Sequence, residues 1–513
     1  MASNGLDGKI PIEEYKLKDA LANTELSWYV GYKIKDICKT HHSTVYVVDF
    51  DLEDHGIKTV AVKHFHQPRE KPGYDLTYTQ SKDPHKTWAR QTEVEKGLTE
   101  LGKKLDEELI PIYCADSTKF LFSEHLPGPS LHELLIEAHN RINSGDAHAE
   151  LYKETALRNA VRNSGHFVGR CIANCDQLES ILGEEKSNGV EKETAMSLFK
   201  NQIARLYYSQ NEDRFTGEEF ELDDVLHYLN NLTLGIDGDL NFNKIVRKIF
   251  DTRDCLVGKK VPQQGDNNPL HHYYPEGTTL ENLDIGTSRK VIDNEKFGYD
   301  SITRDLATIF VGGVDGISTP KGEDLHSLIN QYIGHISVAA KTIDEQERQE
   351  HTKKIDELDH NDLFKYLIEE KMITRNNYAK TFLSFFSDAI LESVHLHATY
   401  QRYDDNNLRQ LFNGLNNYSV EEGKSCKARY AEELMNSVSG FPWLMKEKFW
   451  GDNAQEVKDH FYLMGNLLNE LNILNLDKNM LNTIQNGGLQ GIMYDHMHPT
   501  ETRPPMVASG EEY

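Results

Sequence analysis

The chain has 513 residues, 56 of them basic and 82 acidic, and its formal net charge is −26. Because one hydrophobic core usually organises about 100 to 200 residues, this length excludes a single small module and predicts two or three packed units. The negative charge disfavours a nucleic-acid partner, since no localised basic stripe offsets it. No apolar run is long enough to span a membrane, and the six cysteines are too sparse for a disulfide framework, so we expect a cytoplasmic protein with no membrane partner.

The first part of the chain, up to residue 124, is rich in predicted strands. Short runs of β-branched and aromatic residues alternate there with turn residues. The second and third runs are joined by Glu53-Asp54-His55-Gly56, a polar link of hairpin length, which predicts that they are antiparallel neighbours. Between the third and fourth runs, apolar residues at three- and four-residue spacing predict an amphipathic helix over 87–105. The predicted strands are 29–37, 44–52, 59–65, 110–114 and 119–123.

Apolar residues at three- and four-residue spacing predict that the remainder of the chain is mostly helical. Pro127-Gly128-Pro129 ends the strand-rich part, and a helical pattern begins at Leu131. Residues 261–310 return to short strands and tight turns, and the residues from 486 onwards predict a flexible tail because they show little periodicity. The predicted helices are 152–182, 194–208, 325–343, 362–370, 378–400, 431–446 and 453–474.

Three short motifs contain the candidate catalytic and ligand-binding residues of the sequence. Lys63 ends the predicted strand Val60-Ala61-Val62-Lys63, Asp266 lies in a Gly-Asp turn, and Asp293 stands at the end of another short strand. Each motif occurs often by chance, but their order suits phosphoryl transfer, in which a protein holds charged oxygens and orients a hydroxyl group. A strand lysine can neutralise phosphates, a carboxylate in a rigid turn can accept the hydroxyl proton, and a second aspartate can hold magnesium.

The surroundings of these motifs resemble the aminoglycoside phosphotransferase and choline kinase group, the small-molecule branch of the protein-kinase-like fold. Lys63 is similar to the strand lysine of that group, and Glu93 is similar to its helix partner. The segment 120–131, which reads FLFSEHLPGPSL, resembles the hinge between the two lobes. The resemblance implies a site for ATP at this hinge. The residues implied to line it are Ser123, Glu124 and His125.

The catalytic half of the group's pattern is matched farther along the chain. The segment 264–271 resembles the loop His-Gly-Asp-x-His-Pro-Gly-Asn, which implies that Asp266 is the catalytic base. Ile292-Asp293-Asn294-Glu295 resembles the motif that supplies the main magnesium ligand, which implies this role for Asp293. Asp305, in Arg304-Asp305-Leu306-Ala307, is implied to brace the catalytic loop. The glycine before Asp266 stands where protein kinases carry arginine, and it favours the hydroxyl of a small molecule as the acceptor.

The sequence departs from the group's pattern at its catalytic and phosphate-binding loops. Gln264 and Asn268 replace histidines, and His271 stands where the group has a metal-binding asparagine. Imidazole suits zinc or manganese better than magnesium. Three alternatives stay open: His271 binds the metal through water, Asn267 or Asn268 replaces it, or the protein turns over slowly. No glycine-rich loop precedes the lysine strand, and the hydroxyl of Ser43 with nearby backbone amides could hold phosphate instead.

We therefore expect an α+β, bilobal protein-kinase-like fold with a strand-rich N-lobe and an enlarged helical C-lobe. The expected function is ATP-dependent, magnesium-assisted phosphorylation of a hydroxyl group on a small molecule. A pseudokinase or nucleotide-binding scaffold with little activity, and a helical interaction protein, are the alternatives; the acceptor and the oligomeric state stay open. The expected units are an N-terminal extension (1–27), the N-lobe (28–124), the hinge and start of the C-lobe (125–149), a helical insertion (150–257), the catalytic and metal-binding loops (258–320), C-terminal helices (321–485) and a flexible tail (486–513).

Overall fold

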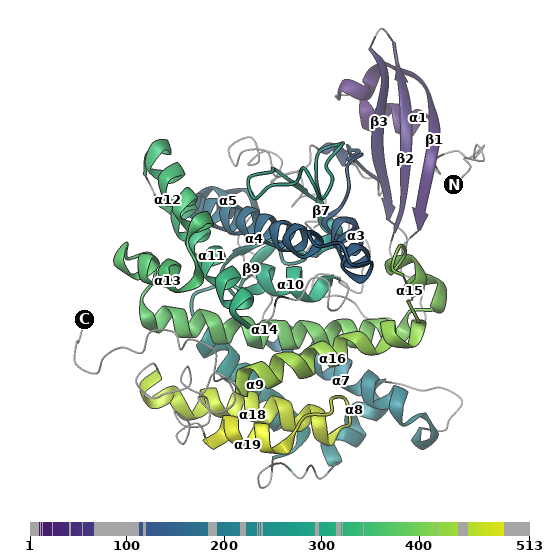
Figure 1. The fold of residues 1–513 in the computed structure, drawn as a ribbon. Helices are drawn as coiled ribbons and strands as arrows, with labels where there is room; N and C mark the ends of the chain where they lie inside the picture. Colours follow the sequence, from purple (N-terminus) through teal and green to yellow (C-terminus); the bar gives the residue numbers. More distant parts are fainter. Residues whose placement is uncertain are drawn as a thin grey trace.

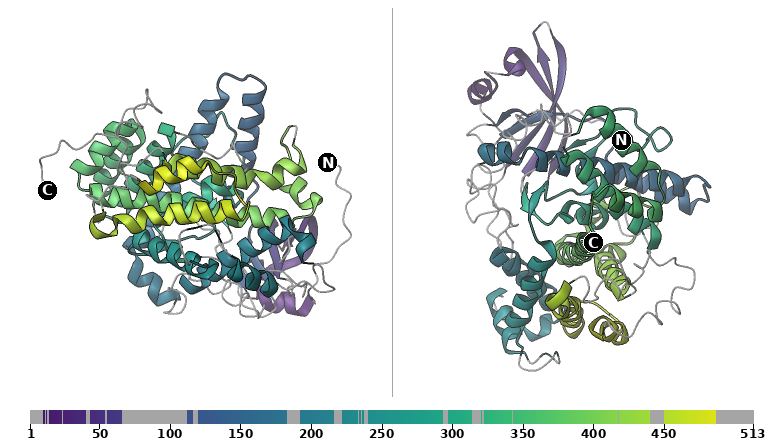
Figure 2. Two further views of the ribbon diagram at one scale, coloured as in Figure 1. Left: turned by 90° about the horizontal axis from the view of Figure 1, so that it is seen from below. Right: turned by 90° about the vertical axis from the view of Figure 1, so that its left-hand side faces the viewer.

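The structure, a computed structural model, consists of a β-sheet followed along the chain by a large helical part (Figure 1). The sheet stands at one end of the helical part, and the side view in Figure 2 shows the same arrangement. The predicted α+β class, with a strand-rich part before a helical one, is confirmed. The structure describes residues 10–65, 112–182, 192–292, 297–439 and 450–486, apart from gaps at 11, 13, 23, 40–42, 54, 116–119, 216–221, 233, 235, 237–239, 314–319, 321, 342 and 417.

Five antiparallel strands form the N-terminal sheet, in the order β1-β2-β3-β5-β4. The hairpin predicted between the second and third strands is present, because β2 pairs with β3 from Ser43 opposite Phe65 to Leu52 opposite Gly56. Gly56 has a φ of 75°, a left-handed conformation that glycine adopts without steric cost. The strands are β1 (Tyr29–Lys39), β2 (Ser43–Leu52), β3 (Gly56–Phe65), β4 (Ile112–Ala115) and β5 (Phe120–Glu124).

The two faces of this sheet have different surroundings. One face carries Val60 and Val62, which are fully buried in a core shared with α1 (Glu14–Leu21) and the 3-10 helix η1 (Glu25–Trp28). Successive side chains of a strand alternate between the faces, so Lys63 lies on the face opposite to that core. Helix α1, η1 and the sheet therefore share one continuous core.

The helical part is organised by long helices that pack in pairs. α4 packs along α11, and α14 packs along α16 (Figure 1). Glycine makes the first contact close, since a β-carbon at Gly169 would lie 2.5 Å from the backbone oxygen of Ile336. No helix in the described part of the chain is long and apolar enough to cross a membrane. The helices are α3 (Leu131–Asn143), α4 (Ala149–Ala173), α5 (Cys175–Leu182), α7 (Lys192–Gln210), η2 (Glu212–Arg214), α8 (Leu222–Asn231), α9 (Phe242–Val257), η3 (Pro269–His271), α10 (Arg304–Gly312), α11 (Gly322–Ala340), α12 (Glu345–Glu357), α13 (His360–Glu369), α14 (Arg375–Arg402), α15 (Asp405–Leu411), α16 (Val420–Ser439), η6 (Gly451–Asn453), α18 (Ala454–Glu470) and α19 (Lys478–Asn486).

Two short two-stranded sheets lie between α9 and α10 in the chain. β6 (Val261–Gln263) pairs with β9 (Gly298–Asp300), and β7 (His272–Tyr273) pairs with β8 (Lys290–Val291). This agrees with the short strands and turns predicted over 261–310. The loop that contains Asp266 runs from β6 to β7, and β7 is hydrogen-bonded to β8, so this loop adjoins the strand that precedes Asp293 in the chain.

Candidate active site

Asp305 fixes the backbone of the predicted catalytic loop. Its two carboxylate oxygens accept hydrogen bonds from the backbone N–H groups of Gln264 and Gly265, both at 2.9 Å. In return, its own backbone N–H donates to the side-chain oxygen of Gln263 at 3.0 Å. Gly265 has a φ of 82°, which explains why glycine is required at this bend. The bracing role implied for Asp305 is thus confirmed by its hydrogen bonds.

The carboxyl group of Asp305 lies in a fully buried position at the start of α10. Burial raises its pKa to about 6, although the backbone donors of Gln264 and Gly265 favour the ionised form. At neutral pH the group is therefore mainly a carboxylate that accepts hydrogen bonds from the loop.

Asp266 and His271 are brought together by the turn that follows β6. The backbone oxygen of Asp266 accepts hydrogen bonds from the backbone N–H of Asn268 at 2.8 Å and from Nδ1 of His271 at 2.9 Å. A carbonyl oxygen can only accept, so Nδ1 of His271 carries the proton and Nε2 carries the lone pair. Such a nitrogen can ligate a metal ion.

The two asparagines considered as replacement metal ligands are used for structure. Asn267 is buried; its Nδ2 donates to the hydroxyl of Ser164 at 2.7 Å, and its Oδ1 contacts Nε2 of His272 at 2.5 Å. The Oδ1 of Asn268 accepts from the backbone N–H of Leu270 at 3.0 Å, which caps η3. Both asparagine side chains therefore have hydrogen-bond partners within the protein.

Ile292, the residue before Asp293, is joined to both ends of this loop. Its backbone N–H donates to the backbone oxygen of His271 at 3.0 Å, and its backbone oxygen accepts from the side chain of Gln264 at 3.1 Å. Gln264, which replaces the group's histidine, thus links the loop to the neighbouring strand. Asp293 itself lies outside the described residues, as do Glu93 and the side chain of Ser43.

Lys63 and the predicted hinge lie on neighbouring strands. β3 pairs with β5, so that Lys63 is opposite Leu121, and the predicted nucleotide-site residue Ser123 is opposite Ala61. His125 follows β5; burial lowers the pKa of its imidazole, and the nearby Lys35 lowers it further. His125 is therefore neutral near pH 7.

Glu124 forms an ion pair that the sequence analysis did not predict. Its Oε2 lies 2.5 Å from Nζ of Lys290, and both side chains are about one-third exposed. Glu124 ends β5 and Lys290 begins β8, so the pair connects the predicted hinge to the strand that precedes Asp293. The side chain of Glu124 is thus engaged with β8 of the helical part.

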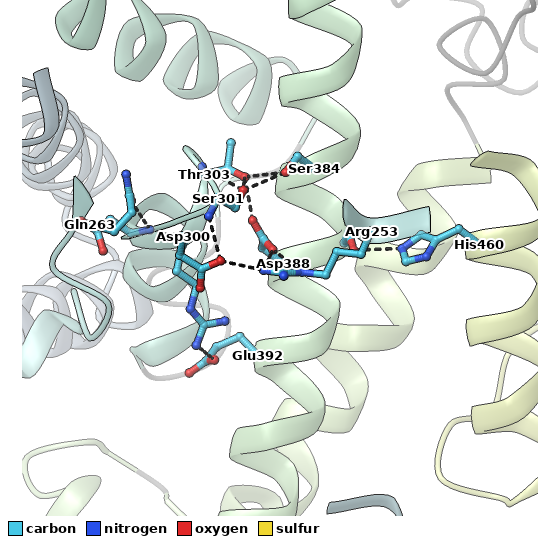
Figure 3. A network of polar contacts seen from close by, with 12 residues as sticks. Arg253, Gln263, Asp300, Ser301, Thr303, Ser384, Asp388, Glu392 and His460 are labelled. Atoms are coloured by element: carbon cyan, nitrogen blue, oxygen red, sulfur yellow. Dashed lines mark hydrogen bonds and ion pairs between the residues drawn. The ribbon is translucent and has the colours of Figure 1, made fainter. Parts of the chain in front are cut away.

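A buried polar network joins β9 and the start of α10 to the helical core (Figure 3). Arg253 of α9 donates to Asp388 of α14 at 2.8 Å and to Asp300 at 3.2 Å. Burial disfavours the ionised form of Asp300, but Arg253 and then Arg304 outweigh it, so the pKa of this carboxyl is lowered. The network holds β9 and the start of α10 against α9 and α14, and it thereby supports Asp305.

The residues that sequence reasoning missed share one property: their partners are distant in the chain. Asn267 and Ser164 are separated by 103 positions, and Lys290 and Glu124 by 166. No local motif marks such pairs. Asn159, Asn163, Ser164 and His166 form a run of buried polar residues on α4, and this run is the signal that could have been noticed.

The donors expected for a divalent metal fit only in part within the described residues. In this part of the chain no group of three or more His, Cys, Asp and Glu side chains is arranged to hold a metal ion. Of the two expected ligands, His271 ends η3 in the loop between β6 and β7, and an imidazole suits manganese or zinc better than magnesium. The remaining expected ligand, Asp293, is outside the described residues.

Comparison with known proteins finds similarity in structure only. No protein-family model matches the sequence, and no curated protein sequence matches it. An ethanolamine kinase of Plasmodium vivax is 12% identical, with 81% of this chain and 85% of that chain covered and a TM-score of 0.36. A choline kinase from Cryptosporidium parvum is 10% identical, with 86% and 99% covered and a TM-score of 0.43. The choline kinase LicA from Streptococcus pneumoniae is 11% identical, with 83% and 99% covered and a TM-score of 0.35.

These solved structures belong to the group that the sequence motifs resemble. LicA has also been solved in complex with AMP. At 10–12% identity the likeness concerns the arrangement of the chain. The functional argument therefore rests on the residues of this chain.

Proposed function

We propose that the chain is an ATP-dependent kinase that phosphorylates a hydroxyl group of a small molecule. One observation carries the proposal: the loop of Asp266 is held by Asp305 at one end and is joined through Ile292 to the strand before Asp293. Phosphoryl transfer depends on positioning and on neutralising charge, and both require carboxylates on a rigid backbone. The carboxylate of Asp305 fixes two N–H groups of the loop and so supplies that rigidity.

In this proposal each residue has one role. Asp266 accepts the proton of the acceptor hydroxyl while the hydroxyl oxygen forms a bond to the γ-phosphorus of ATP. The bond from that phosphorus to the bridging oxygen breaks, and ADP leaves with the electron pair. Lys63, paired with Glu93, neutralises the phosphates, and the backbone at Ser123 to His125 holds the nucleotide base. A divalent metal held by Asp293 and His271 would supply further positive charge to the phosphates.

The variant Asp266→Asn tests the proposal, because it keeps the size of the side chain and removes the base. We expect release of ADP to fall by about 10²- to 10⁴-fold, while ATP still raises the melting temperature. Asp452→Asn, an exposed site in η6, is the matched control and should leave both quantities unchanged. Turnover that persists in Asp266→Asn would remove this residue from the mechanism.

The acceptor is to be found with a panel of alcohols. Choline and ethanolamine are included because the structurally similar enzymes carry those names, and amino sugars, sugars and homoserine-like alcohols complete the panel. ADP formation that depends on one compound identifies the acceptor class. ATP binding without ADP formation on any compound, with either magnesium or manganese, would favour a pseudokinase.

A further inference from the structure

A cluster of basic side chains lies on α4, α11 and α12, next to the turn of α4 whose Ser164 contacts the candidate catalytic loop. Arg158, Arg162 and His166 recur at four-residue spacing on α4, so they share one face of that helix. α11 packs against both α4 and α12 (Figure 1), and it contributes His335, while α12 contributes Arg348. Such a gathering is unexpected in a chain whose net charge is −26.

Close helix packing forms the floor of this cluster. A β-carbon at Gly165 would lie 2.8 Å from Cβ of His335 and 2.9 Å from the backbone oxygen of Tyr332, so α4 and α11 touch at glycine. The rings of His166 and His335 consequently lie 4.9 Å apart between their centroids. Both are buried, with exposed fractions of 7% and 0%, whereas the side chains of Arg162 and Arg348 are 22% and 35% exposed. The cluster thus has a floor of imidazoles and a rim of guanidinium groups that reaches solvent.

The floor is electropositive although its imidazoles are neutral. Burial lowers the pKa of His166 well below its ordinary value, and His335, Arg162, Arg170 and Arg348 lower it further. Burial also lowers the pKa of His335, against the opposing effect of Asp356 and together with that of Arg162 and Arg158. The largest electrostatic effects on His166 all come from basic side chains.

One carboxylate, Asp356, lies within the cluster, and two others pair with its arginines from outside. Asp356 contacts Nε2 of His335 at 3.1 Å and Nε of Arg162 at 3.3 Å. Glu345 pairs with Arg348 at 2.8 Å, and Glu154 lies 3.6 Å from Arg158. Among the described residues, three buried nitrogen atoms in the cluster still have no hydrogen-bond partner: Nε2 of His166, Nδ1 of His335 and Nε of Arg348. Nε of Arg348 is a donor and Nε2 of His166 is able to donate, so these two atoms point to a ligand that carries oxygen acceptors, whereas Nδ1 of His335 carries a lone pair while Nε2 donates to Asp356.

We propose that this cluster is a binding site for a doubly charged oxyanion, a phosphate group or its equivalent, held by Arg162 and Arg348 over the His166–His335 floor. Guanidinium groups bind such anions through charge-assisted hydrogen bonds. Because the anion stabilises imidazolium, its binding favours protonation of the floor, and the affinity rises as the pH falls. The proposal is independent of kinase activity.

Titration calorimetry with sulfate on the full chain tests the proposal, because sulfate carries two charges and does not itself take up protons near pH 7. We expect saturable binding to one site, with a heat that changes with the ionisation enthalpy of the buffer as protons are taken up. Arg348→Gln and Arg162→Gln should each weaken the binding by about tenfold or more. The His166→Gln variant should bind sulfate with less proton uptake than the original chain. Arg247→Gln, which removes an exposed arginine of α9 paired with Glu193, is the matched control and should bind like the original chain.

Inorganic phosphate and glycerol phosphate then distinguish the source of the anion. If glycerol phosphate binds more tightly than inorganic phosphate, the natural ligand is an organic phosphate. If the two bind equally, the natural ligand is the free anion. Either result supports the site, provided that Arg348→Gln abolishes the preference for anions. Sulfate also stabilises proteins generally, but that effect grows linearly with concentration and is common to all variants. Only linear behaviour, or saturable binding unchanged in both Arg348→Gln and Arg162→Gln, overturns the proposal.

Discussion

His271 donates its Nδ1 proton to the backbone oxygen of Asp266 over 2.9 Å. This hydrogen bond fixes the tautomer of the ring and leaves the lone pair on Nε2. An asparagine in this position would instead offer a hard oxygen ligand. The difference between a nitrogen and an oxygen donor has a measurable consequence for metal preference.

We predict that ATP binds more tightly with manganese than with magnesium, and that His271→Asn reduces this preference. The reason is that magnesium prefers oxygen ligands, whereas manganese tolerates imidazole. Dissociation constants of the two metal–ATP complexes, measured by calorimetry, give the ratio directly. His55→Asn, at an exposed site of the β2–β3 link, is the control and should keep the original ratio. An identical ratio in His271→Asn would exclude the ring from the metal site.

A second prediction concerns Asp305 and pH. Its pKa is about 6 in the folded chain and 3.8 ordinarily, so the folded state binds a proton more readily than the unfolded state between these values. Relative to Asp305→Asn, the original chain should therefore gain stability as the pH falls from 7 to 5, by up to roughly 1.4 kcal/mol per pH unit. Urea unfolding at pH 7, 6 and 5 measures the difference. Parallel curves for the two proteins would show that Asp305 does not titrate in this window.

The ion pair between Glu124 and Lys290 allows a charge-exchange experiment. Glu124→Lys and Lys290→Glu should each weaken ATP binding, because like charges would separate the hinge from β8. The double exchange should restore most of the affinity. Since both side chains are about one-third exposed, we expect a coupling energy of no more than about 1 kcal/mol. Thermal shifts measured across an ATP titration give this coupling energy. Additive losses of ATP affinity in the double variant would show that the ion pair does not hold the hinge.

Arg253 should be important for stability rather than for catalysis. Arg253→Met leaves the fully buried carboxylate of Asp388 without its cation, which typically costs about 3 to 5 kcal/mol of unfolding free energy. Arg247→Met on the same helix, where the side chain is 60% exposed, should change it by less than about 0.5 kcal/mol. Chemical unfolding measures both. The double variant Arg253→Met/Asp388→Leu should recover part of the loss, and equal effects of Arg253→Met and Arg247→Met would contradict a structural role for the network.

Local patterns were sufficient to predict the sheet and the catalytic loop. The alternation in β2 and β3 is visible in the sequence, and the loop around Asp266 is a continuous segment whose Gly265 has a positive φ. Helix α12 could not be predicted, because its sequence EQERQEHTKKIDE has only one strongly apolar residue, Ile355, and so shows no apolar period. Contacts such as Lys290 with Glu124 have no periodic signature, since they arise only when distant segments fold together.

Some features of the candidate site follow from local sequence patterns, and others arise only from contacts between distant segments. Asp266 and His271 are brought together as the loop pattern implied, and Asp305 braces the loop as expected. The roles of Lys63 and Asp293 stay predictions. That Asn267 and Asn268 are occupied by structural hydrogen bonds could not be foreseen, because Ser164 approaches the loop only through the packing of α4.

Helix α1 places Leu17 and Leu21 in the same core as Val60 and Val62 of β3. A shortened protein that starts at β1 would therefore expose the apolar face of the strand that carries Lys63, and other molecules could associate with that face. Ile10 belongs to this core as well, so expression trials should keep the residues from Ile10 onwards, and deletion of α1 should yield aggregates even though this helix carries none of the proposed reacting groups.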